Sequence, residues 1–267
     1  MPIEFKEINT FQQFEEITAL QKSIWNLSDS DIISTISLKA LSLKYPLMGL
    51  IMGAYQENKL VAFVICMPTR EPSTLYGLIM GVLPEFQKQE IGNKLGIKIL
   101  EKCLQQGITK MCWTFDPLDS ALGHLYLNKW GAVAAKYEKD FYQLVDEQNS
   151  QIPQDRFVVD CNLNSNRVIE RINRKIEPQS LKEAIQQYPI ATENYFPDTT
   201  EVLVKIPFNY SKLKIENPKL AITYRMQTRA IFDEYIIKRK YFVATMLMDE
   251  IEGERQYFYL MEKRSYI

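Results

Sequence analysis

An apolar strand, a polar turn and an amphipathic helix follow one another between residues 75 and 106, and this run restricts the fold more than any other segment. The strand LYGLIMGVL (75–83) ends at a Pro84-Glu85 break, and a helix is expected over 89–106, where Gly107 stops it. The helix carries an apolar stripe with small residues beside it, at Ile91, Gly92, Leu95, Gly96 and Ile99. A face of this kind lies close against a sheet.

Strand and helix patterns alternate on both sides of this run, which predicts an α+β protein. Before it we expect a strand at 3–8, helices at 11–25 and 37–43, and a hairpin over 47–67. After it we expect a strand at 110–116, a helix over 117–129 and a strand at 132–144. Asp116 is expected to cap that helix, because an aspartate accepts from free amides and Pro117 fits the first helical position.

The polar segment 146–155 is expected to link two domains, residues 1–145 and 146–267. In the second domain the patterns predict a strand at 156–163, a helix at 165–172, a strand at 201–207, a helix at 217–238 and a hairpin at 241–262. The mixed order of these elements loosely repeats that of the first domain.

Charge and residue counts exclude several classes of function. The 32 basic and 33 acidic residues leave a net charge of -1, which provides no field for a nucleic acid or an anionic membrane. No stretch reaches the ~20 apolar residues of a membrane helix. The four cysteines lie singly among apolar neighbours, as buried free thiols do, and the one histidine, His124, excludes a metal site built on several histidines. We therefore expect a cytoplasmic protein without a metal.

The order of the elements and the segment VLPEFQKQEIGNKL (82–95) resemble the GNAT superfamily of N-acetyltransferases, whose loop reads Gln or Arg, two residues, Gly, one residue, Gly or Ala. Gln87, Glu90 and Gly92 take the three defined positions. The resemblance implies that amides of the loop and first helical turn hold the coenzyme A pyrophosphate of acetyl-CoA. The implied cofactor-binding residues are Gly81, Val82, Leu83, Gln87, Lys88, Gln89, Glu90, Ile91, Gly92 and Asn93.

Two further segments, WTFDPL (113–118) and HLYLNKWGAV (124–133), resemble a branch of predicted acetyltransferases in this superfamily. DRFVV (155–159), Tyr224-Arg225 and Arg229 resemble the C-terminal half of the same branch. The resemblance implies a GNAT-like fold with a central mixed sheet and a C-terminal α/β extension. An internal duplication, in which the extension is a second, degenerate GNAT-like half without the cofactor loop, remains a hypothesis. The resemblance names no acceptor.

Glu90 departs from the family pattern, because it replaces a glycine that lets the backbone approach the diphosphate. Its carboxylate has the charge sign of the ligand, which weakens binding if it points at the diphosphate. Alternatively, an acid in the first helical turn is favoured by the helix dipole, and Glu90 with Lys94 forms an i,i+4 pair in solvent. Both interpretations stay open.

The catalytic candidates are His124, Glu85, Asp116, Tyr126 and Asn128. Many GNAT enzymes place a tyrosine where this chain has Leu127, and Tyr126 lies about a hundred degrees round an α-helix from that position. Ser120, His124 and Asn128 share one helical face, which is read either as a solvated polar face or as a catalytic one. His124 is the candidate base, because its ordinary pKa lies near neutrality, and Asn128 a candidate orienting group.

Three functions therefore remain: an N-acyltransferase that moves an acetyl group from acetyl-CoA to an amine, a GNAT-like coenzyme A-binding or regulatory protein without catalysis, and an unrelated α+β protein. The expected partners are acyl-CoA and a small or protein amine, with no nucleic acid and no membrane, and a homodimer is left open.

Overall fold

The computed structural model describes residues 2–45, 48–142, 152–174 and 179–264. The chain forms two compact units, Met1–Trp113 and Thr114–Ile267, which are described separately. This division differs from the predicted domains 1–145 and 146–267, because the strand at 133–138 pairs with strands from the second half of the chain. Most of the predicted linker, residues 146–151, lies outside the described residues.

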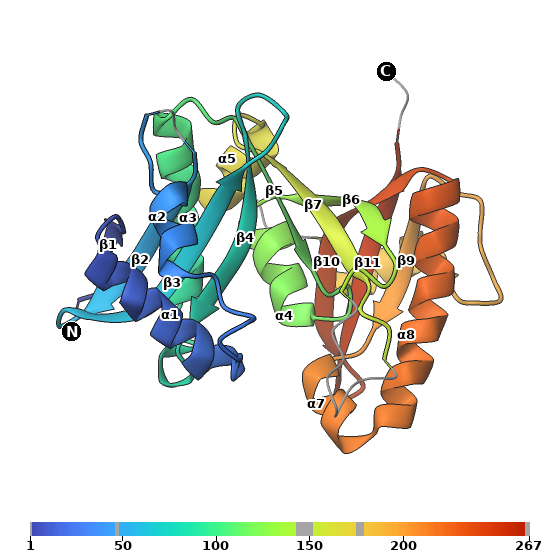
Figure 1. The fold of residues 1–267 in the computed structure, drawn as a ribbon. Coiled ribbons are helices and arrows are strands. Elements are labelled where there is room, and N and C mark those ends of the chain that lie inside the picture. Colours follow the sequence, from blue (N-terminus) through green and yellow to red (C-terminus); the bar gives the residue numbers. More distant parts are fainter. Residues whose placement is uncertain (1, 46–47, 143–151, 175–178, 265–267) are drawn as a thin grey trace. The chain divides into compact units, whose positions relative to one another are not determined.

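The first unit is built on a mixed sheet (Figure 1, blue to green). Its strands lie in the order β1 (Glu4–Glu7), β2 (Leu50–Gln56), β3 (Lys59–Pro68), β4 (Thr74–Val82) and β5 (Lys110–Phe115). Neighbours are antiparallel except β4 and β5, which are parallel. The predicted hairpin is confirmed: Glu57 and Asn58 form its turn with φ of 48° and 65°, as a tight two-residue turn requires.

Three α-helices accompany this sheet: α1 (Phe11–Trp25), α2 (Thr35–Leu41) and α3 (Ile91–Gln105). Thr10 and Gln13 form a capping box at the start of α1. All residues of β3 from Leu60 to Cys66 are buried, so both faces of this strand are covered, and it contacts both α1 and α3. The sequence patterns located all three helices to within two residues at each end.

The second unit contains a sheet in the order β7 (Arg156–Asn162), β6 (Val133–Glu138), β10 (Tyr241–Ile251), β11 (Glu254–Lys263), β9 (Glu201–Ile206) and β8 (Ile190–Ala191). Only β8 and β9 are parallel. Its helices are α4 (Ser120–Gly123), α5 (Asn166–Ile172), α6 (Leu181–Gln187), α7 (Tyr210–Glu216) and α8 (Pro218–Phe232). The sequence analysis missed α6, α7 and β8, which are short.

The helix after Asp116 differs from the prediction. It begins at Ser120, and its cap is Asp119, whose Oδ1 accepts from the Leu122 amide at 3.0 Å. From residue 124 it widens into the π-helix η2 (His124–Lys129), which ends before Gly131 as expected. A second π-helix, η3 (Asp233–Lys238), continues α8. Because a π turn contains more residues than an α turn, face assignments based on 3.6 residues per turn fail here.

Two passages of the second unit share one design, in which a helix ends in a π turn and leads into an antiparallel hairpin: η2 to β6 and β7, and η3 to β10 and β11. Each π-helix is followed, two residues on, by a positive φ, at Gly131 and Lys240. Ala134 and Val243, both five residues past the π-helix, pair directly with each other. The two passages therefore share an order of elements, and the internal duplication stays a hypothesis.

Aromatic rings from several elements fill the core of the second unit. Phe157 of β7 packs against Tyr137, Phe232 and Tyr259, at centroid distances of 5.9, 4.7 and 5.6 Å. Asp155 is fully buried beside them, although it falls within the predicted polar linker. Its carboxylate accepts from Arg229 of α8, from the Tyr137 hydroxyl and from the Asp140 amide.

Candidate functional site

The edge of β4 changes along its length. Its pairing with β3 continues from Pro68↔Leu75 to Ala62↔Val82. Its parallel pairing with β5 extends only from Thr74↔Lys110 to Gly77↔Trp113. Within the described part of the chain, residues 78–82 therefore have a strand on one side and no continued ladder on the other. Backbone amide and carbonyl groups along such an edge are available to an extended ligand.

The turn after β4 is held by its own side chains. Pro84–Phe86 form a single 3₁₀ turn, η1, and the Gln87 side-chain amide donates to the Val82 carbonyl oxygen at 3.1 Å. The Gln89 side-chain amide donates to the Glu85 carbonyl oxygen at 3.0 Å. Two residues of the turn, Lys88 and Glu90, have left-handed backbone conformations with φ of 62° and 61°. The loop is therefore a defined structure that leads from the β4 edge to α3.

Glu90 is the residue before α3, and its positive φ accounts for the glycine of the family pattern, since glycine alone adopts this conformation without strain. Its Oε2 accepts from the Asn93 side-chain amide at 2.9 Å. The i,i+4 pair with Lys94 and a carboxylate that faces the diphosphate both stay open as interpretations of Glu90. The α3 helix starts at Ile91, so its first amides have no intrahelical acceptor and point out of the helix start.

Gly81 and Gly92 lie near this turn, and the space around a Cβ differs between the two positions. A Cβ on Gly81 would lie 2.6 Å from Trp25 and 2.8 Å from Ile24, so this glycine is required where α1 crosses β4. A Cβ on Gly92 would meet Val82 at 3.4 Å and Met80 at 3.9 Å, which are ordinary contacts. Packing therefore explains Gly81 and leaves Gly92 without a steric reason.

Four of the catalytic candidates belong to the second unit, and the fifth, Glu85, belongs to the first. Glu85 is exposed and lies 3.6 Å from Lys59. Asp116 accepts from the Arg225 guanidinium at 2.6 and 2.7 Å and from the Leu118 amide at 2.9 Å. Burial opposes the charge of Arg225, but Asp116, Tyr210 and Asp155 together outweigh it and hold the pKa of Arg225 above its usual value. Asp116 is thus a partner of the buried Arg225, which is 1% exposed.

The shared face of Ser120, His124 and Asn128 is not solvated, because Ser120 and Asn128 are buried. The Asn128 side chain binds the backbone of one residue of β10: it donates to the Met246 carbonyl oxygen at 2.6 Å and accepts from the Met246 amide at 3.0 Å. Its side-chain nitrogen also lies 3.3 Å from His124 Nδ1. Since an amide nitrogen only donates, Nδ1 is the acceptor, and the neutral ring carries its proton on Nε2.

Tyr126 lies inside the second unit. Its ring packs against Phe115 at a centroid distance of 5.4 Å and against Trp130 at 5.0 Å. Burial raises the pKa of its phenol, and the negative charge of Asp119 raises it further. The phenol is therefore held protonated at neutral pH.

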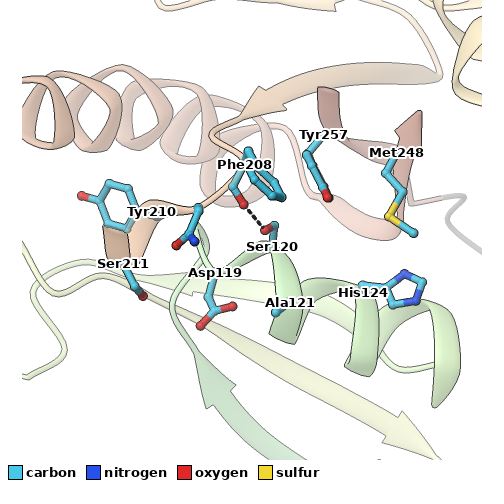
Figure 2. A pocket seen from close by; sticks show the side chains of 10 residues that line it. Asp119, Ser120, Ala121, His124, Phe208, Tyr210, Ser211, Met248 and Tyr257 are labelled. Atoms are coloured by element: carbon cyan, nitrogen blue, oxygen red, sulfur yellow. Dashed lines mark hydrogen bonds between the residues drawn. The ribbon is translucent and has the colours of Figure 1, made fainter. Parts of the chain in front are cut away.

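A cavity of about 390 Å³ opens beside α4 in the second unit (Figure 2). Its wall comes from the start of α4 and η2, the turn between β9 and α7, and strands β10 and β11. It includes His124 together with four side chains that the sequence analysis did not select, namely Asp119, Phe208, Met248 and Tyr257. No local pattern marks the last three, which come from distant parts of the chain. Asp119 had one signal, as a helix-capping residue type three residues after Asp116.

No group of three or more histidine, cysteine, aspartate or glutamate side chains in the described residues has the arrangement of a metal site. Over the same residues, no helix has the length and apolar character that crossing a bilayer requires. All four cysteines are free thiols, of which Cys66, Cys103 and Cys161 are buried and Cys112 is half-buried.

Residues 12–131 match the family model described as the acetyltransferase (GNAT) family. Among similar solved structures is the ribosomal-protein-S18-alanine N-acetyltransferase from Escherichia coli, with 13% identity, a TM-score of 0.51, and coverage of 61% of this chain and 96% of that one. A probable acetyltransferase from Staphylococcus epidermidis ATCC 12228 is 14% identical with a TM-score of 0.51, and the match covers 60% of this chain and 99% of that one. The N-acetyltransferase from Staphylococcus aureus Mu50 is 12% identical with a TM-score of 0.50, and the match covers 61% of this chain and 100% of that one. No curated protein matches the chain.

Proposed function

We propose that this chain, whose residues 12–131 match the acetyltransferase (GNAT) family, transfers an acetyl group from acetyl-CoA to an amine. The observation that carries this proposal is the end of the β4–β5 ladder at Gly77, directly before the turn and helix start at 83–93. An extended pantetheine arm fits the edge of residues 78–82. A pyrophosphate fits the amides at the start of α3, where the helix dipole also favours negative charge.

In the proposed reaction the acceptor gives up one proton and its nitrogen attacks the thioester carbonyl. The carbon–sulfur bond then breaks, and the coenzyme A thiolate takes up one proton. His124 remains the proposed base. Its Nδ1 would accept the proton, and the hydrogen bond from the Asn128 side-chain amide to Nδ1 would break. Asn128 is the proposed orienting group of this ring. Glu85, Asp116 and Tyr126 stay weaker proposals, since Asp116 is paired with Arg225 and burial holds the Tyr126 proton.

The test is binding followed by turnover. Acetyl-CoA at a hundredfold its dissociation constant should stabilise the native protein by about 2.7 kcal/mol, because it binds only the folded state. Release of the coenzyme A thiol with a panel of amines should then separate an enzyme from a binding protein. If neither acetyl-CoA nor adenosine 3',5'-bisphosphate raises the melting temperature, the acyl donor assignment is lost.

A coenzyme A-binding protein without catalysis is the second candidate, and the observation that favours it is Glu90. Its carboxylate lies beside the proposed pyrophosphate site. Its backbone has a left-handed conformation, which is strained for a residue other than glycine. Binding of acetyl-CoA without thiol release for any amine of the panel would support this candidate over the enzyme.

Replacing Glu90 by glutamine should tighten coenzyme A binding by about fivefold at low salt, because it removes a like charge and keeps an acceptor for Asn93. Glu90→Gly should do the same and also remove the strain of the positive φ. Calorimetric titration measures both. The control is Glu101→Gln on the same helix, which removes an acid paired with Lys98 and should leave affinity unchanged. Weaker binding by Glu90→Gln would show instead that the carboxylate supports the site.

Replacing Gly92 by alanine should separate binding from stability. The added methyl group makes only ordinary contacts, and alanine in a helix is favoured over glycine, so the free energy of unfolding should rise by up to about 0.5 kcal/mol. Coenzyme A affinity should stay within about twofold, because alanine is one of the two residues that the family pattern allows at this position. Denaturation and titration of one preparation test both parts. A tenfold loss of affinity would mean that the methyl group stands in the path of the ligand.

A further inference from the structure

The cavity beside α4 is built mostly from the C-terminal part of the chain. Phe208 and its neighbours in the turn to α7, Met248 of β10 and Tyr257 of β11 all lie outside residues 12–131, which match the acetyltransferase family. Its volume of about 390 Å³ falls within the range of small-molecule sites, roughly 300 to 1,000 Å³. The chain therefore adds to its family domain a separate site of the size that one small organic molecule needs.

One part of the cavity wall is apolar and held in place. The rings of Phe208 and Tyr257 stack with centroids 5.4 Å apart and an interplanar angle of 22°. Phe208 is 50% exposed and Met248 49% exposed, so both side chains offer apolar surface to a ligand. The buried Ser120 hydroxyl donates to the Phe208 carbonyl oxygen at 2.6 Å, the bond drawn in Figure 2, and so fixes the turn that carries this ring.

A single carboxylate, Asp119, lines the cavity. Its Oδ1 caps α4 through the Leu122 amide. Burial raises the pKa of Asp119 and the nearby negative charge of Asp116 adds to this, while the Leu122 amide acts in the opposite direction. A carboxylate that is partly desolvated in this way gains from a bound cation. His124, Ser120, Asn209 and Ser211 are further polar side chains in the wall.

Cationic side chains at the rim provide a comparison. The Arg255 guanidinium lies 5.7 Å over the Phe208 ring, so this ring already accepts a cation on one face. Lys214 is the cation nearest to Asp119 and lies 5.7 Å over the Tyr210 ring. The alternative ligand is an aromatic anion bound by these two cations. Such an anion would leave the Asp119 carboxylate without a positively charged group of the ligand beside it.

We propose that this cavity binds an amine with an apolar body, whose ammonium group pairs with Asp119 and whose body lies against Phe208, Tyr257 and Met248. The proposal concerns binding at this cavity and does not depend on the proposed acetyl transfer.

Ligand-observed saturation-transfer NMR tests the binding with 2-phenylethylamine as probe, next to its neutral isostere 2-phenylethanol and the anion 3-phenylpropionate. The intact protein should bind the amine and neither of the others. Asp119→Asn should weaken binding about tenfold or more, because asparagine caps a helix as well as aspartate but carries no charge. Phe208→Ala should weaken it severalfold. Asp198→Asn, an exposed acid paired with Lys263, is the control and should change nothing.

Failure of the amine to bind, equal binding by Asp119→Asn with an unchanged melting temperature, or preference for the anion overturns the proposal. None of these three results bears on the proposed binding of acetyl-CoA, which is tested by its own titration.

Discussion

Replacing Asp155 by alanine is expected to lower the free energy of unfolding by about 3 to 5 kcal/mol, because it removes one partner of a buried ion pair and leaves the other behind. Asp155 is fully buried and accepts from Arg229, whose side chain is only 18% exposed, and from the Tyr137 hydroxyl. The variant would leave a guanidinium and a phenol without their shared acceptor. Urea denaturation of both proteins gives the difference.

Asp140 provides the matched control, because it binds the same Arg229 at 2.8 Å but its side chain is 53% exposed. Solvent screens an ion pair of this kind, so Asp140→Ala should cost less than about 1 kcal/mol. Similar losses for the two variants would mean that burial of Asp155 does not set its contribution.

Replacing Gly131 by alanine should be the second large change, with a loss of about 3 kcal/mol or more. Gly131 has a φ of 74°, and a Cβ there would lie 2.9 Å from both the Arg167 carbonyl oxygen and Val168 Cα. Arg167 approaches this closely because its guanidinium donates to the Gly131 carbonyl oxygen at 2.8 Å. The methyl group would have to push α5 away from the end of η2.

A Gly107→Ala variant distinguishes the effect of backbone strain from the effect of this steric clash. Its φ of 76° is nearly the same, and a Cβ there would have nothing within 4 Å. Gly107→Ala should therefore cost only the strain, about 1 to 2 kcal/mol. Thermal or urea unfolding of both alanine variants measures the difference, and equal losses would contradict the close approach of α5 to Gly131.

The sequence predicted those elements that local patterns specify. Two apolar runs located β2 and β3 of the hairpin over 47–67, and the end of α3 before Gly107 was confirmed because residue type determines it. The loop between β4 and α3 was located from its resemblance to GNAT proteins. The left-handed conformation of Glu90 then explains the family glycine that the chain lacks.

Interactions between distant residues account for the errors. Asp116 looked like a helix cap, but Arg225, 109 residues further on, binds its carboxylate, and Asp119 caps the helix. The face with Asn128 looked solvated, since nothing local indicates that its amide binds the β10 backbone 118 residues away. The cavity wall at Phe208 and Tyr257 likewise assembles only in the folded unit, so no spacing in the sequence predicts it.

Hydrogen exchange of the protein with and without acetyl-CoA tests most directly the proposal that the β4 edge and the α3 start hold the acyl donor. Acetyl-CoA should protect amides both in residues 78–82 and in residues 90–93, because the pantetheine arm and the pyrophosphate bind separate stretches of backbone. Adenosine 3',5'-bisphosphate, which has no pantetheine arm, should leave residues 78–82 unprotected. Saturating acetyl-CoA that slows exchange in neither stretch, or only elsewhere in the chain, would contradict the proposal.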